Sequence, residues 1–211
     1  MENQRKIVQT LLNQQPMQKN IRVRKQTKSS NYITTDDCHQ DYIVLDFETT
    51  GMRAGADKII SVLALQYKNH MEIERFETLI NPQRHIPLEV TQRTGLSNAE
   101  VGAAPIMEEV INDLVSFIGE LPIVIHDSSF EMGFLESLHD FSTVRLPKYT
   151  VVDTTKLARK VASQLEDIEK MKRIAFLLGT KQESLSGISD CRATADIYKY
   201  CCEVSSEAIE S

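Results

Sequence analysis

Two acidic residues at the end of an apolar, β-branched segment have a spacing that permits metal chemistry. Asp46 and Glu48 follow the apolar residues 42–45 and are separated by Phe47. Side chains alternate along a strand, so the two carboxylates project on the same side. Such a pair repels itself unless a cation lies between the acids, and hard oxygen ligands suit Mg²⁺ or Mn²⁺. A pair of solvated acids at a strand end is the alternative for this motif taken alone.

Two further acidic residues occur at the starts of expected helices. Glu131 follows a short apolar strand at the beginning of one helix, and Asp190 lies in the first turn of another. Acids in a first turn also interact favourably with the helix dipole, so Asp190 taken alone is ambiguous. Gly51, close behind the acid pair, lacks a Cβ and would let a ligand approach the backbone.

The order and spacing of these acids resemble the DEDDh exonucleases, a family that includes the proofreading subunit of bacterial replicative polymerases. Residues 46–51 match the first family motif, residues 126–135 follow the second, and residues 190–194 match the second half of the third. The similarity extends from about residue 41 to residue 202. It implies a ribonuclease-H-like fold and a 3′–5′ exonuclease that acts on the 3′ ends of single-stranded DNA or RNA.

The resemblance also implies roles for particular residues. The expected catalytic and metal-binding residues are Asp46, Glu48, Glu131 and Asp190, which would hold two Mg²⁺ or Mn²⁺ ions for phosphodiester hydrolysis. The expected substrate-binding residues are Thr49, Thr50, Gly51, Thr94, Gly95, Leu96, His126 and Phe130.

Two departures from the family pattern affect catalysis. The catalytic histidine of the family lies five residues before the third-motif acid, and Leu185 stands at that position. Leucine cannot accept a proton, so the general base is missing, and Ser186 does not supply the tyrosine of a related variant. Glu131 replaces the second-motif aspartate, which moves a carboxylate outward by about 1.5 Å. Asp127 replaces the usual asparagine and is a candidate to compensate.

Two classes of function therefore stay open. The first is a metal-dependent 3′–5′ exonuclease of weakened activity, which the surviving set Asp46, Glu48 and Asp190 favours. The second is a catalytically inactive relative that binds nucleic acid or a protein partner on the same scaffold.

The surrounding sequence predicts an α/β fold that can position these acids. Strands are expected at residues 42–45, 59–66 and 72–79, joined by short turns as an antiparallel meander. Strand–helix alternation follows, with strands at 122–126 and 151–153, and Thr154 is expected to cap the next helix. The prediction is a ribonuclease-H-like, five-stranded mixed sheet, three antiparallel strands and then two parallel ones, flanked by helices. Its helices include residues 104–118, 130–139, 168–178 and 190–201.

Bulk composition is that of a globular protein, with 41% hydrophobic and 26% charged residues among 211. No apolar run approaches the length of a membrane helix, so no membrane association is expected. Cys38, Cys191, Cys201 and Cys202 show no CxxC or zinc-ligand spacing. They are therefore expected to be free thiols of a cytoplasmic protein.

The net charge of −6 conceals a strongly basic N-terminus. Residues 1–30 hold seven basic residues and one acidic residue, which leaves 17 basic and 29 acidic residues in the rest of the chain. We expect residues 1–40 to form a basic arm, with a short amphipathic helix in residues 1–14 and a linker after it. Residues 41–204 would form the exonuclease-like domain and 205–211 a tail. The arm could contact phosphate groups, serve a protein partner, or dock on its own acidic domain.

Overall fold

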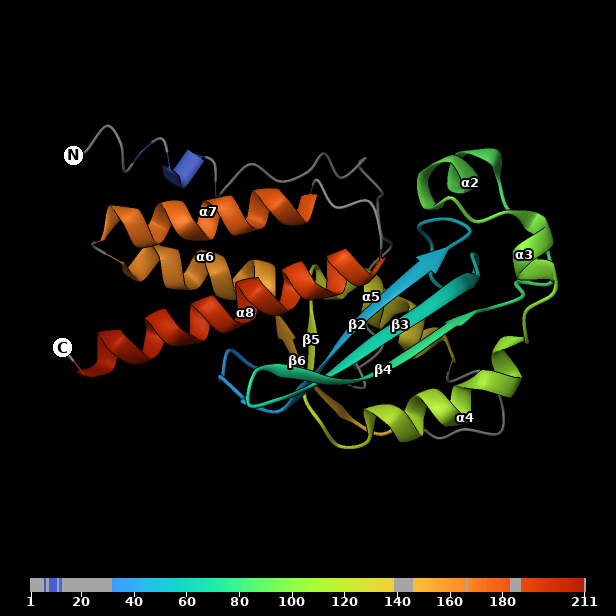
Figure 1. Ribbon diagram of the computed structural model, residues 1–211, viewed down its shortest axis with the longest axis horizontal. Coiled ribbons are helices and arrows are strands. Elements are labelled where there is room, and N and C mark those ends of the chain that lie inside the picture. The colour runs from blue at the N-terminus through green and yellow to red at the C-terminus, as the bar shows by residue number, and fades with distance from the viewer. Residues whose placement is uncertain are drawn as a thin grey trace.

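A central six-stranded sheet flanked by helices forms the molecule (Figure 1). The computed structural model describes residues 6, 8–10, 12, 32–138, 146–165, 167–182 and 187–210. The strands are β1 (Tyr32–Thr34), β2 (Tyr42–Thr49), β3 (Ile59–Lys68), β4 (Met71–Leu79), β5 (Ile123–Ile125) and β6 (Tyr149–Asp153). The helices are α2 (Leu88–Thr94), α3 (Asn98–Gly102), α4 (Met107–Ile118), α5 (Ser128–Ser137), α6 (Thr154–Gln164), α7 (Ile168–Gln182) and α8 (Gly187–Glu210).

The strands are ordered β1-β6-β5-β2-β3-β4. β2, β3 and β4 are antiparallel neighbours, whereas β5 and β6 run parallel to β2 and to each other. The predicted mixed α/β sheet is confirmed, but the count of five strands is wrong. The sixth strand, β1, pairs in parallel with β6 and lies in the segment predicted to be a linker. Its pairing partner is more than 100 residues away in the sequence, so local pattern gives no sign of it.

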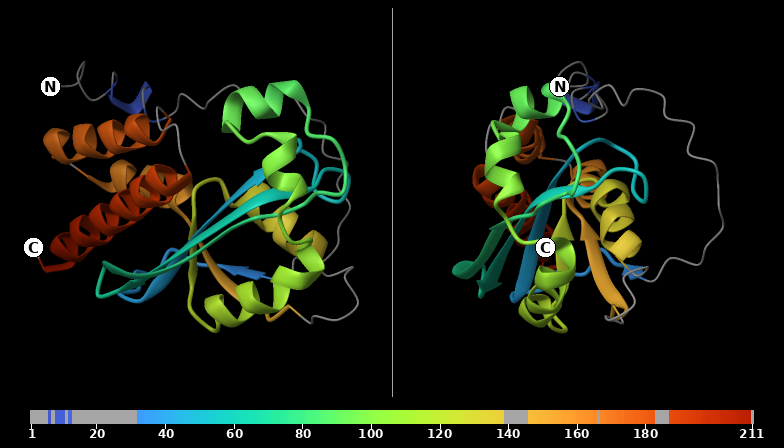
Figure 2. Two further views of the ribbon diagram at one scale, coloured as in Figure 1. Left: turned by 45° about the vertical axis from the view of Figure 1, so that its right-hand side comes forward. Right: turned by 90° about the vertical axis from the view of Figure 1, so that its right-hand side faces the viewer.

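The two faces of the sheet are covered by different helices. Tyr42 and Val44 of β2 face a core that includes side chains of α6, α7 and α8. The alternating residues Ile43, Leu45 and Phe47 face a second core, made with α4 and α5. Figure 2 shows α5 and α8 on opposite sides of the sheet. The near-continuous burial of β2 follows, because helices cover both of its faces.

The N-cap of the helix after β6 lies one residue earlier than predicted. The carboxylate of Asp153 accepts a hydrogen bond from the backbone N–H of Lys156, so Asp153 is the N-cap of α6. Thr154, the residue expected to cap this helix, is its first residue instead. Aspartate is as good an N-cap as threonine, and here the last strand residue already carries one.

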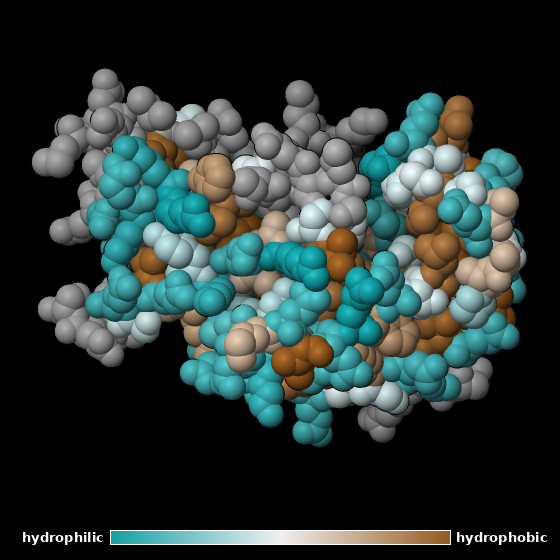
Figure 3. Space-filling view, in the orientation of Figure 1, coloured by the Kyte–Doolittle hydropathy of each residue, from teal (hydrophilic) through white to brown (hydrophobic). Residues whose placement is uncertain are grey.

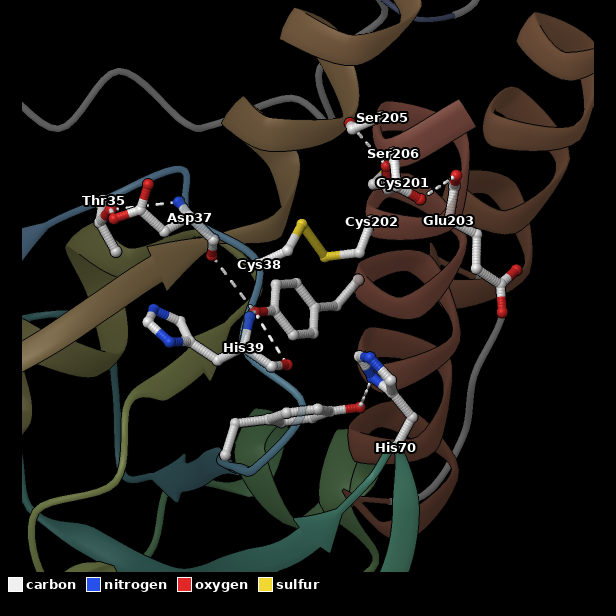
Figure 4. The surroundings of a disulfide bond; sticks show 12 residues. Thr35, Asp37, Cys38, His39, His70, Cys201, Cys202, Glu203, Ser205 and Ser206 are labelled. Carbon is white, nitrogen blue, oxygen red and sulfur yellow. Dashed lines mark hydrogen bonds between the residues drawn. A yellow bond between two sulfur atoms is a disulfide. The ribbon is translucent and has the colours of Figure 1, made fainter. Parts of the chain in front are cut away.

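A disulfide joins the segment after β1 to the last helix (Figure 4). The sulfur atoms of Cys38 and Cys202 are bonded, although the two residues are 164 positions apart in the sequence. The expectation of free thiols is wrong for this pair, because the chain after β1 passes beside α8 and brings the two Cα atoms to 5.6 Å. Cys191 and Cys201 are not disulfide-bonded, and both are buried. The argument from free thiols for a cytoplasmic location is therefore lost.

The same segment is held by the hydroxyl of Tyr198 on α8. This hydroxyl accepts a hydrogen bond of 2.6 Å from the backbone N–H of His39 and donates one of 3.3 Å to the carbonyl of Asp37. The Tyr198 ring packs edge-on against Tyr42 of β2, with ring centroids 4.8 Å apart. Residues 35–41 are thus fixed to both the sheet and α8.

Helical residues occur near both ends of the chain. Residues 6, 8–10 and 12 are helical, and Val8 and Leu12 are buried in the core with α6, α7 and α8. The amphipathic N-terminal helix therefore docks on the domain. At the other end, α8 continues to Glu210, through residues predicted to be a tail.

The face of the molecule in Figure 3 is largely hydrophilic. Among the described residues, large apolar side chains that are exposed lie on several different elements. They are Ile33, Met52, Met71, Ile73, Leu88 and Phe176. In the described part of the chain, no helix has the length and apolarity that crossing a membrane requires.

Candidate active site

The acid pair lies at the carboxyl end of β2, on the face that α8 covers. Asp46 is paired with Leu63 of β3 and Glu48 with Ser61, so the two acids follow Tyr42 and Val44 on one side of the strand. Both acids are partly buried. The structure therefore has the two carboxylates on a common face at a strand end, as the alternation of side chains requires.

The first turn of α8 approaches this pair from the same side of the sheet (Figure 1). Gly187 opens the helix, and a Cβ added to it would lie 3.6 Å from Oδ2 of Asp46 and 3.6 Å from Cδ2 of Leu63. Asp190, three residues later, is partly buried in the same first turn. Both distances from the added Cβ are ordinary van der Waals contacts, so the first turn of α8 lies directly against Asp46.

Glu131 lies at the same end of the sheet as Asp46 and Glu48, on a helix that packs on the opposite face. It lies in the first turn of α5, which follows β5, the parallel neighbour of β2. Its side chain is only 6% exposed, and α5 packs against β2 and β6 through Met132 and Phe134. Parallel strands end at a common edge, so an acid just after β5 and acids at the end of β2 belong to one end of the sheet.

The four predicted ligands are not gathered into one cluster. Within the described ranges, no three histidine, cysteine, aspartate or glutamate side chains lie together so as to hold a metal ion. Asp46 and Glu48 nevertheless fit Mg²⁺ or Mn²⁺ by the chemistry of their oxygen donors. Protein-bound Mg²⁺ keeps several water ligands and needs only one or two carboxylates.

An arginine that the sequence analysis did not select contacts this pair. Nη2 of Arg93, in the last turn of α2, lies 3.5 Å from Oε2 of Glu48. A cation therefore lies beside one of the two carboxylates. The signal in the sequence was a basic residue immediately before the segment 94–96, which was expected to bind substrate.

The threonines after the acid pair hold a loop in place. Thr49 and Thr50 are buried, and the Thr49 hydroxyl donates to the carbonyl of Gly51. The Thr50 hydroxyl accepts from the backbone N–H of Lys58, and the Thr50 N–H donates to the Lys58 carbonyl. The space beside Gly51 is taken by Asp57, whose carboxylate would lie 2.6 Å from an added Cβ. Substrate contact by these residues stays a prediction, and what the structure gives is their part in fixing the loop.

The segment Thr94, Gly95 and Leu96 forms the end of α2 and the turn after it. Gly95 has a φ of 75°, a left-handed conformation that glycine adopts without strain, and its N–H closes the helix on the carbonyl of Thr91. The Thr94 hydroxyl donates to the carbonyl of Val90, and Leu96 packs on a small core with Val90. These hydrogen bonds and the packing of Leu96 hold the segment in place, next to Arg93, the arginine that contacts Glu48.

His126 and Phe130 flank the start of α5. Nδ1 of His126 lies 3.0 Å from the Thr154 hydroxyl at the start of α6. The ring of Phe130 packs against Phe134 with centroids 5.0 Å apart. Asp127 between them has a left-handed backbone with a φ of 62°. These contacts explain how the two residues are positioned, and their expected contact with substrate stays a prediction.

One carboxylate fastens the starts of α5 and α6 together. Oδ2 of Asp153 accepts hydrogen bonds from the backbone N–H and the hydroxyl of Ser128, the first residue of α5. Oδ1 of Asp153 caps α6 by accepting from the N–H of Lys156. Burial alone would raise the pKa of Asp153, but the hydrogen bonds from Ser128 and Lys156 outweigh it and hold the pKa below its ordinary value. The helix that carries Glu131 is thereby tied to the sheet.

Leu185 and Ser186, the two positions that would supply a general base in related enzymes, lie outside the described residues. Their interpretation rests on the sequence.

The sheet order, with acids at the end of β2 and on the helices that begin near it, defines an α/β fold of the ribonuclease-H-like class. The chain belongs to the exonuclease family, RNase T type, whose profile matches residues 43–198.

Sequence relatives include parts of large DNA polymerases. The PolC-type DNA polymerase III of Clostridium perfringens is 32% identical over 162 residues, which cover 76% of this chain and 11% of that protein. The corresponding protein of Bacillus subtilis is 36% identical over 121 residues, or 57% of this chain and 8% of that protein. The chain thus spans about a tenth of the length of these relatives.

Solved structures share the fold at low sequence identity. Exonuclease X in complex with 5′ overhanging duplex DNA aligns with a TM-score of 0.55 and 20% identity, covering 78% of this chain and 93% of that one. A 3′-exonuclease solved for 3′-end recognition of a histone mRNA stem-loop aligns with a TM-score of 0.61 and 14% identity. That alignment covers 83% of this chain and 67% of the other.

Proposed function

We propose that the domain hydrolyses the terminal phosphodiester bond at the 3′ end of single-stranded DNA or RNA, with Mg²⁺ or Mn²⁺ as cofactor. The observation that carries the proposal is the arrangement at the end of β2. Asp46 and Glu48 share one face there, and the first turn of α8, which carries Asp190, starts against Asp46. Membership of the exonuclease family and relatives within DNA polymerases support the same reaction.

Each residue of the site is assigned a role in metal binding or in substrate orientation. Asp46 and Glu48 would hold the divalent ion, and Asp190 and Glu131 would complete the site once the carboxylates draw together around it. A bound ion supplies a water of lowered pKa and stabilises negative charge on the phosphate. The loop that begins at the buried residues Thr49 and Thr50 would orient the terminal nucleotide relative to the acids.

Low activity is part of the proposal. Leu185 cannot accept the proton of the attacking water, and general-base catalysis contributes roughly 10²–10⁴-fold to rate. Glu131 places its carboxylate about one bond further out than aspartate, whereas catalytic groups need positions within about 0.5 Å. The domain would then depend on its ion for most of its rate enhancement.

The second candidate is a binding domain that has lost hydrolysis. The observation that favours it is Leu185, which stands where related enzymes have the general base. Such a domain would bind nucleic-acid 3′ ends or a protein partner and leave the strand intact.

Degradation of a 5′-labelled single strand under single-turnover conditions with Mn²⁺ tests the proposal. The expected result is a ladder that shortens from the 3′ end, and its loss in Asp46→Asn. A 3′-blocked strand is the matched substrate control and should persist. Equal product from the wild type and Asp46→Asn would mean that a contaminating nuclease makes the ladder, and the proposal would be wrong.

The Leu185→His variant tests whether low activity comes from the missing general base or from a metal site that no longer binds its ion. A modest gain in rate is expected from this change alone, because the new imidazole has to find its own position. A larger gain is expected when Glu131→Asp is added, and the two gains should be more than additive since they act on one transition state. A double variant that stays at the level of Asp46→Asn would favour the binding domain.

A further inference from the structure

We propose that Arg93 is an exchangeable cation of this site. In the metal-free protein its guanidinium neutralises Glu48, and it moves to a phosphate oxygen of the nucleic-acid strand when Glu48 takes up a divalent ion. The inference rests on the proposed function, because it assigns Glu48 to an ion and the neighbouring space to a strand.

The contact between Arg93 and Glu48 is one that can exchange. The two side chains are 53% and 28% exposed, and the nitrogen and oxygen are 3.5 Å apart. A second pair, Arg192 and Glu72, is similarly exposed, at 55% and 28%, but differs in geometry: Arg192 donates two hydrogen bonds, of 2.8 and 3.1 Å, to the carboxylate of Glu72. Exposed pairs of the first kind contribute little to stability, so breaking the Arg93 contact costs little.

The backbone beneath Arg93 is fixed, so exchange needs only a side-chain movement. Val90 of α2 is buried in a small core with Ile86, Ile60 of β3 and Val101 of α3. The turn at Gly95 closes the helix directly after Arg93 and Thr94. α2 lies beyond the end of β2 (Figure 1), so a flexible arginine side chain projects from a rigid base at the rim of the acid pair.

The chemistry of the guanidinium fits both positions. Its positive charge can relieve the repulsion between Asp46 and Glu48 when no metal is present. Its planar fork of N–H donors also matches a phosphate group, which it binds through two parallel hydrogen bonds. A divalent ion on Glu48 would repel the guanidinium from the carboxylate and leave it free for a phosphate next to the segment 94–96.

Mn²⁺ titration without nucleic acid tests the first half of the exchange. Arg93→Gln removes the competing cation, and calorimetry should show Mn²⁺ binding roughly 2- to 5-fold tighter than in the wild type. Arg53→Gln is the matched control, because Arg53 is another exposed arginine with a carboxylate partner, Asp57, at 3.8 Å in the neighbouring loop. Its Mn²⁺ affinity should equal that of the wild type.

Strand binding tests the second half. With Mn²⁺ present and a 3′ terminus protected by phosphorothioate linkages, fluorescence anisotropy should show roughly 10-fold weaker binding by Arg93→Gln. Arg93→Lys should recover part of that loss, because it restores the charge without the fork.

The outcomes separate this inference from the proposed function. An unchanged Mn²⁺ affinity or an unchanged strand affinity in Arg93→Gln overturns the inference. In that case, if the wild type binds Mn²⁺ and Asp46→Asn does not, the metal site of the proposed function is still supported. Mn²⁺ binding by neither the wild type nor Arg93→Gln would overturn both.

Discussion

Asp153 shows how one side chain can position a helix of the candidate site without being one of the predicted site residues. Its carboxylate accepts hydrogen bonds from Ser128 at the start of α5 and from Lys156 in α6, and it is 5% exposed. Four residues into α5, Glu131 depends on this attachment for its place at the edge of the sheet. The hydrogen bonds hold the pKa of Asp153 below its ordinary value despite burial, which by itself would raise it.

Asp153→Asn should lower the free energy of unfolding by about 1–3 kcal/mol at pH 7, because a carboxylate that accepts several hydrogen bonds becomes an amide with one acceptor oxygen. A lowered pKa means that the contribution of the carboxylate is present above its unfolded pKa of about 4 and is lost as the pH falls below that value. Urea unfolding of the wild type and the variant at pH 7, 5 and 3 measures this difference, which should shrink between pH 5 and pH 3.

Asp36→Asn is the control for that experiment, because Asp36 is exposed and pairs with a lysine, Lys160, at the surface. It should cost little at any pH. A difference between wild type and Asp153→Asn that is constant over the whole pH range would show that packing, and not the ionised carboxylate, is what the substitution disturbs.

At the scale of helices and strands, the sequence predicted the elements that show a local hydrophobic pattern or carry a motif. The apolar run before Asp46 is a buried strand, and the antiparallel meander of β2, β3 and β4 is present. A short turn joins β3 to β4 as predicted, whereas the longer loop of residues 50–58 joins β2 to β3. β1 was missed because three residues, of which only Tyr32 is not exposed, gain their strand identity from pairing with β6. The disulfide was missed for a related reason, since no spacing in the sequence brings Cys38 to Cys202.

In the candidate site, too, features set by local sequence could be predicted, whereas contacts set by tertiary packing could not. The common side of Asp46 and Glu48 is a consequence of strand alternation and could be predicted. The contact of Arg93 with Glu48 depends on how α2 folds back over the end of the sheet, which is a property of tertiary packing.

Reduction of the disulfide should destabilise the fold. In the chain-entropy view, a link between residues 164 apart restricts the unfolded chain by up to about 5 kcal/mol, which corresponds to a decrease in Tm of roughly 10 °C on reduction. Thermal melts with and without a dithiol reductant measure the change. Cys38→Ser should melt at the temperature of the reduced wild type and show no further response to reductant.

Cys201 lies next to Cys202 and could be thought to exchange with the disulfide. Burial raises the pKa of the Cys201 thiol to about 12, so almost none of it is thiolate at neutral pH. Cys201→Ser should therefore retain the response of the wild type to reductant. Equal melting temperatures of the oxidised and reduced wild type would show that the link is not formed or that it does not stabilise the fold.

At the scale of the whole molecule, the basic N-terminus is attached to an acidic domain at a defined place. Val8 and Leu12 are buried against the helices on one face of the sheet, and Nε of Arg159 in α6 donates to the carbonyl of Leu12. The start of the chain is thus part of the core. The basic residues that follow, Lys19, Arg22, Arg24, Lys25 and Lys28, lie outside the described residues.

This attachment decides how the role of the arm has to be tested. Deleting residues 1–30 would expose the part of the core that Val8 and Leu12 cover and would confuse lost binding with lost stability. Replacing the five basic residues between 19 and 28 with glutamine removes the charge and leaves the docked helix in place.

If the arm contacts phosphates of a single strand, the slope of log K against log salt should flatten by up to about 3.5, because each contact contributes about 0.7. Anisotropy titrations over a range of salt concentrations measure that slope, while single-turnover hydrolysis at saturating strand should be unchanged, because none of the five residues is assigned to the acid site. A variant with residues 13–30 in scrambled order keeps the charge and should keep the slope of the wild type. A glutamine variant with that same slope would mean that the arm makes no phosphate contacts, and a protein partner would then account better for its basic residues.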